Sequence, residues 1–282
     1  MLILFVLCLI YSQFPDEHFD QNYPIWVYWE TKPGKTKPEY INLCLKSLHQ
    51  HNDNYFKIIE LDDKNIYNYL PELRRDLNNL AIAQKTDYIR VALLAKYGGI
   101  WIDADTIVMR SLLPIKQKLD EKYDYVGFGC SFNKCFNGYP KPSNGLMASL
   151  PNSVLMNNLL NNLNNKLDKK QENYNYFDLG KLSLWDEINK LSKTGYKYYH
   201  FDSKYDGSRD INGKWINVDN HISKTPTKFI DDTSLLVVFL ENNKFSGDNP
   251  KYNFFSKLSS QQILSGDYWI SSLFRRSFGL TL

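Results

Sequence analysis

Residues 86–105 read Thr86-Asp87-Tyr88-Ile89-Arg90-Val91-Ala92-Leu93-Leu94-Ala95-Lys96-Tyr97-Gly98-Gly99-Ile100-Trp101-Ile102-Asp103-Ala104-Asp105. The apolar residues up to Tyr97 recur at helical spacing and Thr86 is a suitable N-cap, so we expect a helix between these two residues. Gly98 stands where the end of a helix favours a left-handed residue. Residues 100–102 are too few for a helix and are apolar on both faces, which predicts a strand buried in the middle of a sheet.

Two aspartates follow this strand. Asp103 and Asp105 lie on the same side of an extended backbone, because side chains alternate with a period of two. Two like charges this close repel unless a cation lies between them, and carboxylate oxygens without Cys or His favour Mg²⁺ or Mn²⁺. In open α/β sheets, ligands bind beyond the carboxyl ends of the strands. Asp-x-Asp also occurs in surface turns, but the glycine pair and the buried strand before it favour a metal site.

The rest of the chain alternates between strand and helix patterns. This order argues for parallel strands joined by crossover helices, and the chain length suits one large core but not two domains, so we expect a single α/β domain. The further strands that we expect are 25–29, 56–61, 124–129, 196–201, 215–218 and 235–240, and the further helices are 39–49, 153–168, 182–191 and 259–278.

A family resemblance rests on Asp87-x-x-Arg90 and on residues 98–105, which look like the core motif of glycosyltransferases with an Asp-x-Asp (DXD) sugar-binding region. More narrowly, the chain resembles the capsular polysaccharide synthesis proteins grouped in glycosyltransferase family 32, through Ile25-Trp26-Val27-Tyr28-Trp29-Glu30 and residues 61–66 as well. The resemblance implies a GT-A fold, with a Rossmann-like, mostly parallel mixed sheet flanked by helices. It also implies that a hexose or related sugar moves from a nucleotide-sugar donor, commonly a UDP-sugar, to a hydroxyl of a glycan or glycoconjugate acceptor.

The resemblance implies roles for the residues of the motif. Asp105 would hold a divalent metal, Mn²⁺ or Mg²⁺, and Asp103 would share that metal or bind the ribose or sugar of the donor. Asp87 and Arg90 would contact hydroxyls of the donor sugar, although their spacing also suits a plain ion pair on a helix. The family is expected to retain the anomeric configuration of the donor.

Four further residues complete the expected site. Tyr28 and Trp29, at the end of the first strand, would lie beside the donor base, where they stack on the base or pack in the core. Asn144 falls in a segment that resembles one near the sugar site, and with the glycine after it is also an ordinary tight-turn pair. Phosphate oxygens and water supply most ligands of such a metal, and His221 is the candidate for a further protein ligand, with His200 behind it.

Two other functions stay open. Residues 101–105 also look like the nucleophile strand of haloacid-dehalogenase-like phosphatases, but Ile107 stands where that motif wants Thr or Val. The later acidic motif of those phosphatases is not completed by Gly247-Asp248 or by Gly266-Asp267. The third reading is a transferase homologue that binds sugar without turnover, and a donor-hydrolysis assay would separate it from an enzyme.

Composition and net charge indicate which classes of binding partner to expect. The chain has 282 residues, 43% of them hydrophobic and 23% charged, which suits one large core. The formal net charge of +3 gives no reason to expect a nucleic-acid partner, whereas a nucleotide diphosphate needs only a local positive pocket. No Asn-x-Ser/Thr acceptor occurs, which leans against a glycosylating lumen and favours a cytoplasmic or membrane-associated protein over a secretory one.

The N-terminal residues are apolar. Residues 1–10 fall short of the roughly 20 apolar residues that span a bilayer, and no Lys or Arg precedes them as in a signal peptide. A weak signal or anchor, with membrane association through residues 1–11, and a segment that packs on the domain both stay open. We therefore expect an apolar leader or packed segment over residues 1–22 and a glycosyltransferase domain over residues 23–282.

Overall fold

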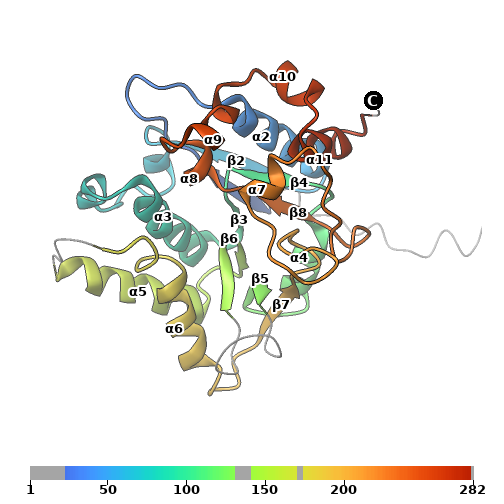
Figure 1. Cartoon of the computed structure of the whole chain (residues 1–282). Helices are drawn as coiled ribbons and strands as arrows, with labels where there is room; N and C mark the ends of the chain where they lie inside the picture. The colour runs from blue at the N-terminus through green and yellow to red at the C-terminus, as the bar shows by residue number, and fades with distance from the viewer. Residues whose placement is uncertain (1–22, 131–140, 170–173, 281–282) are drawn as a thin grey trace, which may run out of the picture.

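The computed structural model describes residues 23–130, 141–169 and 174–280, and a six-stranded sheet forms its centre (Figure 1). The strands lie in the order β2-β1-β3-β6-β5-β7. Strand β1 pairs in parallel with β2 and β3, β5 pairs in parallel with β7, and β6 is antiparallel to both β3 and β5. The predicted α/β fold with a mixed, mostly parallel sheet is confirmed. The strands are β1 (Pro24–Tyr28), β2 (Lys57–Leu61), β3 (Gly99–Ile102), β5 (Tyr125–Cys130), β6 (Lys141–Ser149) and β7 (Tyr198–Asp202).

Helices cover both faces of this sheet (Figure 1). One face packs against α2, α4 and α11, and the other packs against α3, α5 and α6. A small second sheet pairs β4 (Thr106–Val108) with β8 (Val237–Phe239) in an antiparallel manner. The helices are α2 (Glu39–Asn52), α3 (Ile82–Tyr97), α4 (Leu113–Asp120), α5 (Val154–Asp168), α6 (Lys181–Leu191), α7 (Val218–His221), α8 (Asn242–Phe245), α9 (Pro250–Asn253), α10 (Ser260–Ser265) and α11 (Trp269–Ser277).

Strand β3 lies in the middle of the sheet, as predicted. Gly98 caps the end of helix α3, and Gly99 is the first residue of β3. Gly98 and Gly99 have φ angles of +64° and +100°, which L side chains rarely adopt. A Cβ on Gly98 would lie 2.5 Å from Pro151 N, and one on Gly99 would lie 2.6 Å from Pro24 O. Both positions therefore require glycine, and they start β3 tightly against its neighbours.

Helix α3 begins earlier than the sequence predicted. Its first residue is Ile82, with Ala81 as N-cap, so Thr86 lies inside the helix and the expected N-cap was wrong. The Gln84 side chain accepts a hydrogen bond from Ala81 N at 3.3 Å, which satisfies one of the free backbone donors at this end. The predicted end of the helix at Tyr97 is confirmed.

Asn144 and the glycine after it lie within strand β6, so of the two interpretations of this segment the structure excludes the tight turn. Two other local expectations were wrong. Residues 215–218 are not a strand, because Trp215 forms only an isolated bridge with Arg209 and Val218 begins helix α7. The helix expected over 259–278 is interrupted at Gly266, which separates α10 from α11.

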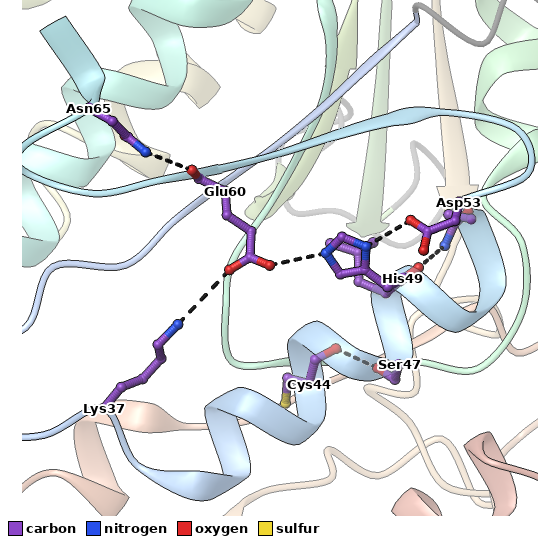
Figure 2. Close-up of polar contacts among 9 residues, drawn as sticks. Lys37, Cys44, Ser47, His49, Asp53, Glu60 and Asn65 are labelled. Carbon is purple, nitrogen blue, oxygen red and sulfur yellow. Dashed lines mark hydrogen bonds and ion pairs between the residues drawn. The ribbon is translucent and has the colours of Figure 1, made fainter. Parts of the chain in front are cut away.

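Helix α2 is fixed to the sheet at its surface and at its core. At the surface, His49 lies between two carboxylates, with Nδ1 2.7 Å from Asp53 Oδ1 and Nε2 3.0 Å from Glu60 Oε1 on β2 (Figure 2). In the core, the Ser47 hydroxyl accepts a hydrogen bond from Val108 N at 2.9 Å. Because β4 comes directly after Asp105, the contact at Ser47 also holds the segment that carries this aspartate.

The expected leader, residues 1–22, lies outside the described residues. Within residues 23–130, 141–169 and 174–280, no helix combines the length and apolar character that a membrane span requires.

Candidate active site

Asp103 lies directly after the carboxyl end of β3. Its backbone N donates to Gly145 O of β6 at 2.8 Å, so the pairing of β3 with β6 fixes its position. Trp101 Nε1 donates to Asp103 Oδ1 at 2.9 Å, and the Asp103 side chain is 31% exposed. The carboxylate is therefore oriented by the sheet and still reaches solvent, as a ligand-binding group must.

Arg90 joins the predicted site residues into one cluster. Its Nη2 lies 3.1 Å from Asp87 Oδ1, and its Nη1 lies 3.0 Å from Asp103 Oδ1. The same Nη1 donates to the backbone carbonyl of Asn144, and the guanidinium lies over the Trp101 ring at 5.1 Å from the ring centroid. Arg90 is 5% exposed, so this is a buried ion-pair network rather than a pair on the surface of a helix.

Asn144 completes the network from strand β6. Its Nδ2 donates to Asp87 Oδ1 at 2.8 Å. Gly180, the residue before α6, packs on the same two side chains, because a Cβ built on it would lie 2.4 Å from Asp87 Oδ2 and 2.7 Å from Asn144 Nδ2. Sequence reasoning missed Gly180, since a glycine before a helix has no local feature that marks contact with a distant aspartate.

Asp105 lies next to this cluster. Its Oδ2 accepts a hydrogen bond from Asn242 N, the first residue of α8, at 3.0 Å. Burial and then the negative charge of Asp103 raise the pKa of Asp105. Burial also raises the pKa of Asp87 to about 6, against the opposing charge of Arg90. Among the described residues, Arg90 pairs with Asp87 and Asp103 but forms no ion pair with Asp105, so a cation bound at Asp105 and Asp103 would offset negative charge that the guanidinium does not neutralise.

The two histidines lie apart from this cluster. His221 is 2% exposed and its ring stacks on Trp269, with 5.7 Å between the ring centroids. Burial lowers the pKa of His221, and that of His200 on β7, to about 4. Among the described residues, no three His, Cys, Asp or Glu side chains are grouped to hold a metal, so His221 does not form such a group with Asp103 and Asp105.

Tyr28 is the last residue of strand β1, which pairs with β3 in the sheet, and Trp29 follows it directly. Tyr28 is 4% exposed, and its hydroxyl donates to Glu30 Oε2 at 2.7 Å. Glu30 in turn pairs with Lys85 Nζ of α3 at 2.9 Å. Trp29 is half-buried, and its buried Nε1 has no hydrogen-bond partner among the described residues. Part of the Trp29 ring is therefore open to solvent although its Nε1 is covered by protein, whereas Tyr28 is largely a core residue.

Comparison with protein-family models matches residues 8–182 to the family described as capsular polysaccharide synthesis protein. The chain belongs to this family. A comparison with curated protein sequences found no match.

Among solved structures, this family member is similar to several glycosyltransferases. For the PaToxG glycosyltransferase the TM-score is 0.44 at 14% identity, over 60% of this chain and 69% of that one. For the glycosyltransferase GlyE of Streptococcus pneumoniae TIGR4 the TM-score is 0.46 at 13% identity, over 92% of this chain and 64% of that one. For the galactosyltransferase LgtC in complex with donor and acceptor sugar analogues the TM-score is 0.45 at 10% identity, over 92% of this chain and 96% of that one. The match thus spans less than two thirds of the GlyE chain.

Proposed function

We propose that this chain is a metal-dependent glycosyltransferase that moves a hexose or related sugar from a nucleotide-sugar donor, in the first instance a UDP-sugar, to a hydroxyl of a glycan acceptor. Membership of the capsular polysaccharide synthesis family supports a role in polysaccharide biosynthesis. The observation that carries the proposal is the Arg90 network, in which one guanidinium contacts Asp87 and Asp103. Such a network, placed at the carboxyl end of β3, suits a polyhydroxylated ligand.

Asp87, Arg90 and Asn144 would bind the donor sugar. A carboxylate accepts hydrogen bonds from hydroxyls, whereas a guanidinium donates to them, so together they suit neighbouring hydroxyls of a ring. The three side chains come from α3 and β6 and hold one another in place. Because their geometry is set before the ligand arrives, little ordering is needed on binding. A site built on such hydrogen bonds also discriminates sharply against a sugar that lacks one hydroxyl.

Asp105 and Asp103 would hold Mn²⁺ or Mg²⁺. Their carboxylate oxygens are hard ligands that suit either ion, and the excess negative charge of the cluster favours a cation. Asp103 Oδ1 is already shared with Arg90 and Trp101, so Asp105 would be the principal ligand. His221 would have to leave its stack on Trp269 to contribute, so we assign the remaining positions to phosphate and water. When bound, the ion would neutralise charge on the leaving diphosphate.

Trp29 would contact the donor base. It lies directly after β1, beside the strand that leads to the aspartates, and its half-buried ring packs on the core. An indole ring stacks on a base. Tyr28 would not contact the base itself, because it is buried and its hydroxyl already donates to Glu30. It would instead help to position Trp29, the next residue.

A panel of nucleotide sugars tests the proposal. We expect one donor to release its nucleoside diphosphate in a Mn²⁺-dependent manner, slowly with water and faster with a glycan acceptor. Donor binding without release would instead identify a sugar-binding homologue, and release of inorganic phosphate alone would identify a phosphatase. We also propose that the anomeric configuration is retained, which NMR of the transfer product decides.

A further inference from the structure

The segment 174–180, between α5 and α6, is held against the site by helix α3. Gln84 Nε2 donates to Tyr174 O at 2.9 Å and lies 3.4 Å from Asn175 O. At the other end of the segment, Gly180 packs directly on Asp87. Gln84 and Asp87 are three residues apart on α3, so one face of this helix holds both ends of the segment.

Two large aromatic side chains between these anchors are exposed. Tyr176 is 54% exposed and Phe177 is 44% exposed. Their rings are nearly perpendicular, with centroids 4.9 Å apart, and Lys181 Nζ lies 3.5 Å from the Phe177 centroid. The cation over one face of Phe177 fixes that ring, and Phe177 in turn limits the orientation of Tyr176. Two neighbouring exposed aromatic rings form a contiguous apolar patch, which marks a binding surface more often than a single exposed ring does.

Tyr176 belongs to a segment that ends against the carboxylate cluster, because Gly180 at its end packs on Asp87. Partial burial, and then the negative charges of Asp87, Asp103 and Asp105, raise the pKa of the Tyr176 hydroxyl, which agrees with this placement. Much of the ring remains open to solvent.

We propose that Tyr176, supported by Phe177, is the platform on which the acceptor saccharide binds; this inference rests on the proposed glycosyltransferase function. The C–H face of a pyranose packs on an aromatic ring, while its hydroxyls point outward from the edge. The donor sugar would occupy Asp87, Arg90 and Asn144, which lie on the buried side of the segment, so the exposed side is left for the acceptor. A growing glycan is long, so its binding site must be open to solvent, as the exposed side of this segment is.

The transfer step balances with these two sugars alone. The bond between the anomeric carbon and the diphosphate oxygen breaks, and a bond from that carbon to the acceptor oxygen forms. The proton of the acceptor hydroxyl leaves with the diphosphate. The platform takes no part in bond making, because its role is to hold the reacting hydroxyl near the anomeric carbon.

Saturation-transfer NMR with methyl glycosides of common hexoses and N-acetylhexosamines, in the presence of UDP and diamagnetic Mg²⁺, tests the platform. We expect saturation of ring C–H protons of at least one glycoside by the wild-type protein and by Tyr176→Phe, which keeps the ring, and loss of the signal in Tyr176→Ala. Trp215→Ala is the matched control, since Trp215 is a 56% exposed aromatic with Arg209 over its ring, and it should behave as wild type. No signal from any glycoside with the wild-type protein, or an equal signal from Tyr176→Ala, would overturn the platform.

Kinetics with the bound glycoside as acceptor separate this inference from the proposed function. Tyr176→Ala should raise the acceptor KM about five- to tenfold, the loss of one stacked ring, and leave donor hydrolysis by water unchanged. An unchanged acceptor KM in this variant would refute the platform and leave the transferase intact. Absence of donor turnover in the wild-type protein would refute the transferase, and the acceptor platform with it.

Discussion

Arg90 Nη1 lies 3.0 Å from Asp103 Oδ1, so an ion pair between a buried arginine and a partly exposed aspartate joins helix α3 to the end of β3 at the centre of the candidate site. The pair links the proposed sugar-binding residues on α3 to the proposed metal-binding residues after β3. The same guanidinium also pairs with Asp87, so one side chain contacts both halves of the site.

Arg90→Lys should keep the fold and lose function. A lysine ammonium is a point charge on a flexible stem, and it cannot replace the planar fork that contacts Asp87, Asp103 and the carbonyl of Asn144 together. We expect donor turnover to fall at least about tenfold, as kcat/KM with the preferred donor will measure. Arg90→Ala should in addition lower the free energy of unfolding by about 3 kcal/mol, because it leaves buried carboxylates unpaired. Wild-type turnover in Arg90→Lys would contradict the assignment.

Asp87 should make the protein less stable as the pH rises from about 4 to about 6. Burial raises its pKa to about 6 in the folded chain, so between the unfolded and folded pKa values the folded state binds more protons and loses stability as pH increases. Asp87→Asn should flatten this part of the curve by about 2 kcal/mol, measured by urea unfolding across the pH range. Asp63→Asn, which changes an exposed carboxylate after β2, should leave the slope unaltered. An unchanged slope in Asp87→Asn would show that Asp87 is not desolvated.

Gly180→Ala should impair the donor site without unfolding the protein. Its Cβ would lie 2.4 Å from Asp87 Oδ2, a contact that real side chains do not make, so Asp87 or the start of α6 must move. We expect donor kcat/KM to fall about tenfold or more, with an unchanged far-UV spectrum. Gly213→Ala is the control. Its φ of +75° disfavours alanine, but the added Cβ would have no atom within 4 Å, so this change strains the backbone without a steric clash. This control should lose about 1 kcal/mol of stability and no turnover.

His49 should stabilise the fold more in acid than in base. Partial burial alone would lower its pKa, but the hydrogen bonds to Asp53 and Glu60 outweigh burial and raise the pKa overall (Figure 2). Its contribution is thus fully present below about pH 6.5 and is lost as pH rises through the raised folded pKa. His49→Gln should lower the free energy of unfolding more at about pH 5 than at about pH 9, as urea unfolding will measure, by at most about 1 kcal/mol because the side chain is 37% exposed.

His51, on the same helix, should affect the pH dependence of stability in the opposite direction to His49. Burial lowers its pKa, so in the wild-type protein acidification acts against folding at this position. His51→Gln should therefore reduce the loss of stability in acid, and the same trend in both histidine variants would contradict the assigned contacts.

The sequence predicted the centre of this site because its residues fall in one local run. Helical periodicity placed Asp87 and Arg90 on one helix, and a short apolar strand placed Asp103 at its end. The N-cap at Thr86 failed because that choice rested on residue type alone, whereas the helix begins at Ile82 with the Gln84 side chain bound to the backbone at Ala81.

The contributions from distant segments were harder to predict. Asn144 and the glycine after it have strong turn propensity, but pairing of β6 with strands on both sides overrides that preference. Tyr176 and Gly180 meet the site only through tertiary packing, and no periodicity or motif marks them. His221 was chosen as a candidate metal ligand because of its residue type. Its ring is instead stacked on Trp269, and the sequence around His221 does not reveal this contact with a distant residue.

The central claim is that Asp105 is the principal ligand of a catalytic metal, and Mn²⁺-dependent release of nucleoside diphosphate by Asp105→Asn tests it most directly. Burial and the charge of Asp103 raise the pKa of Asp105, so its ionised form opposes folding and the neutral amide should leave Tm unlowered. We predict a loss of metal-dependent release on the order of 100-fold, while Asp53→Asn, on an exposed carboxylate of the α2 surface, keeps wild-type release. A folded Asp105→Asn protein with near-wild-type release in Mn²⁺ would contradict the claim.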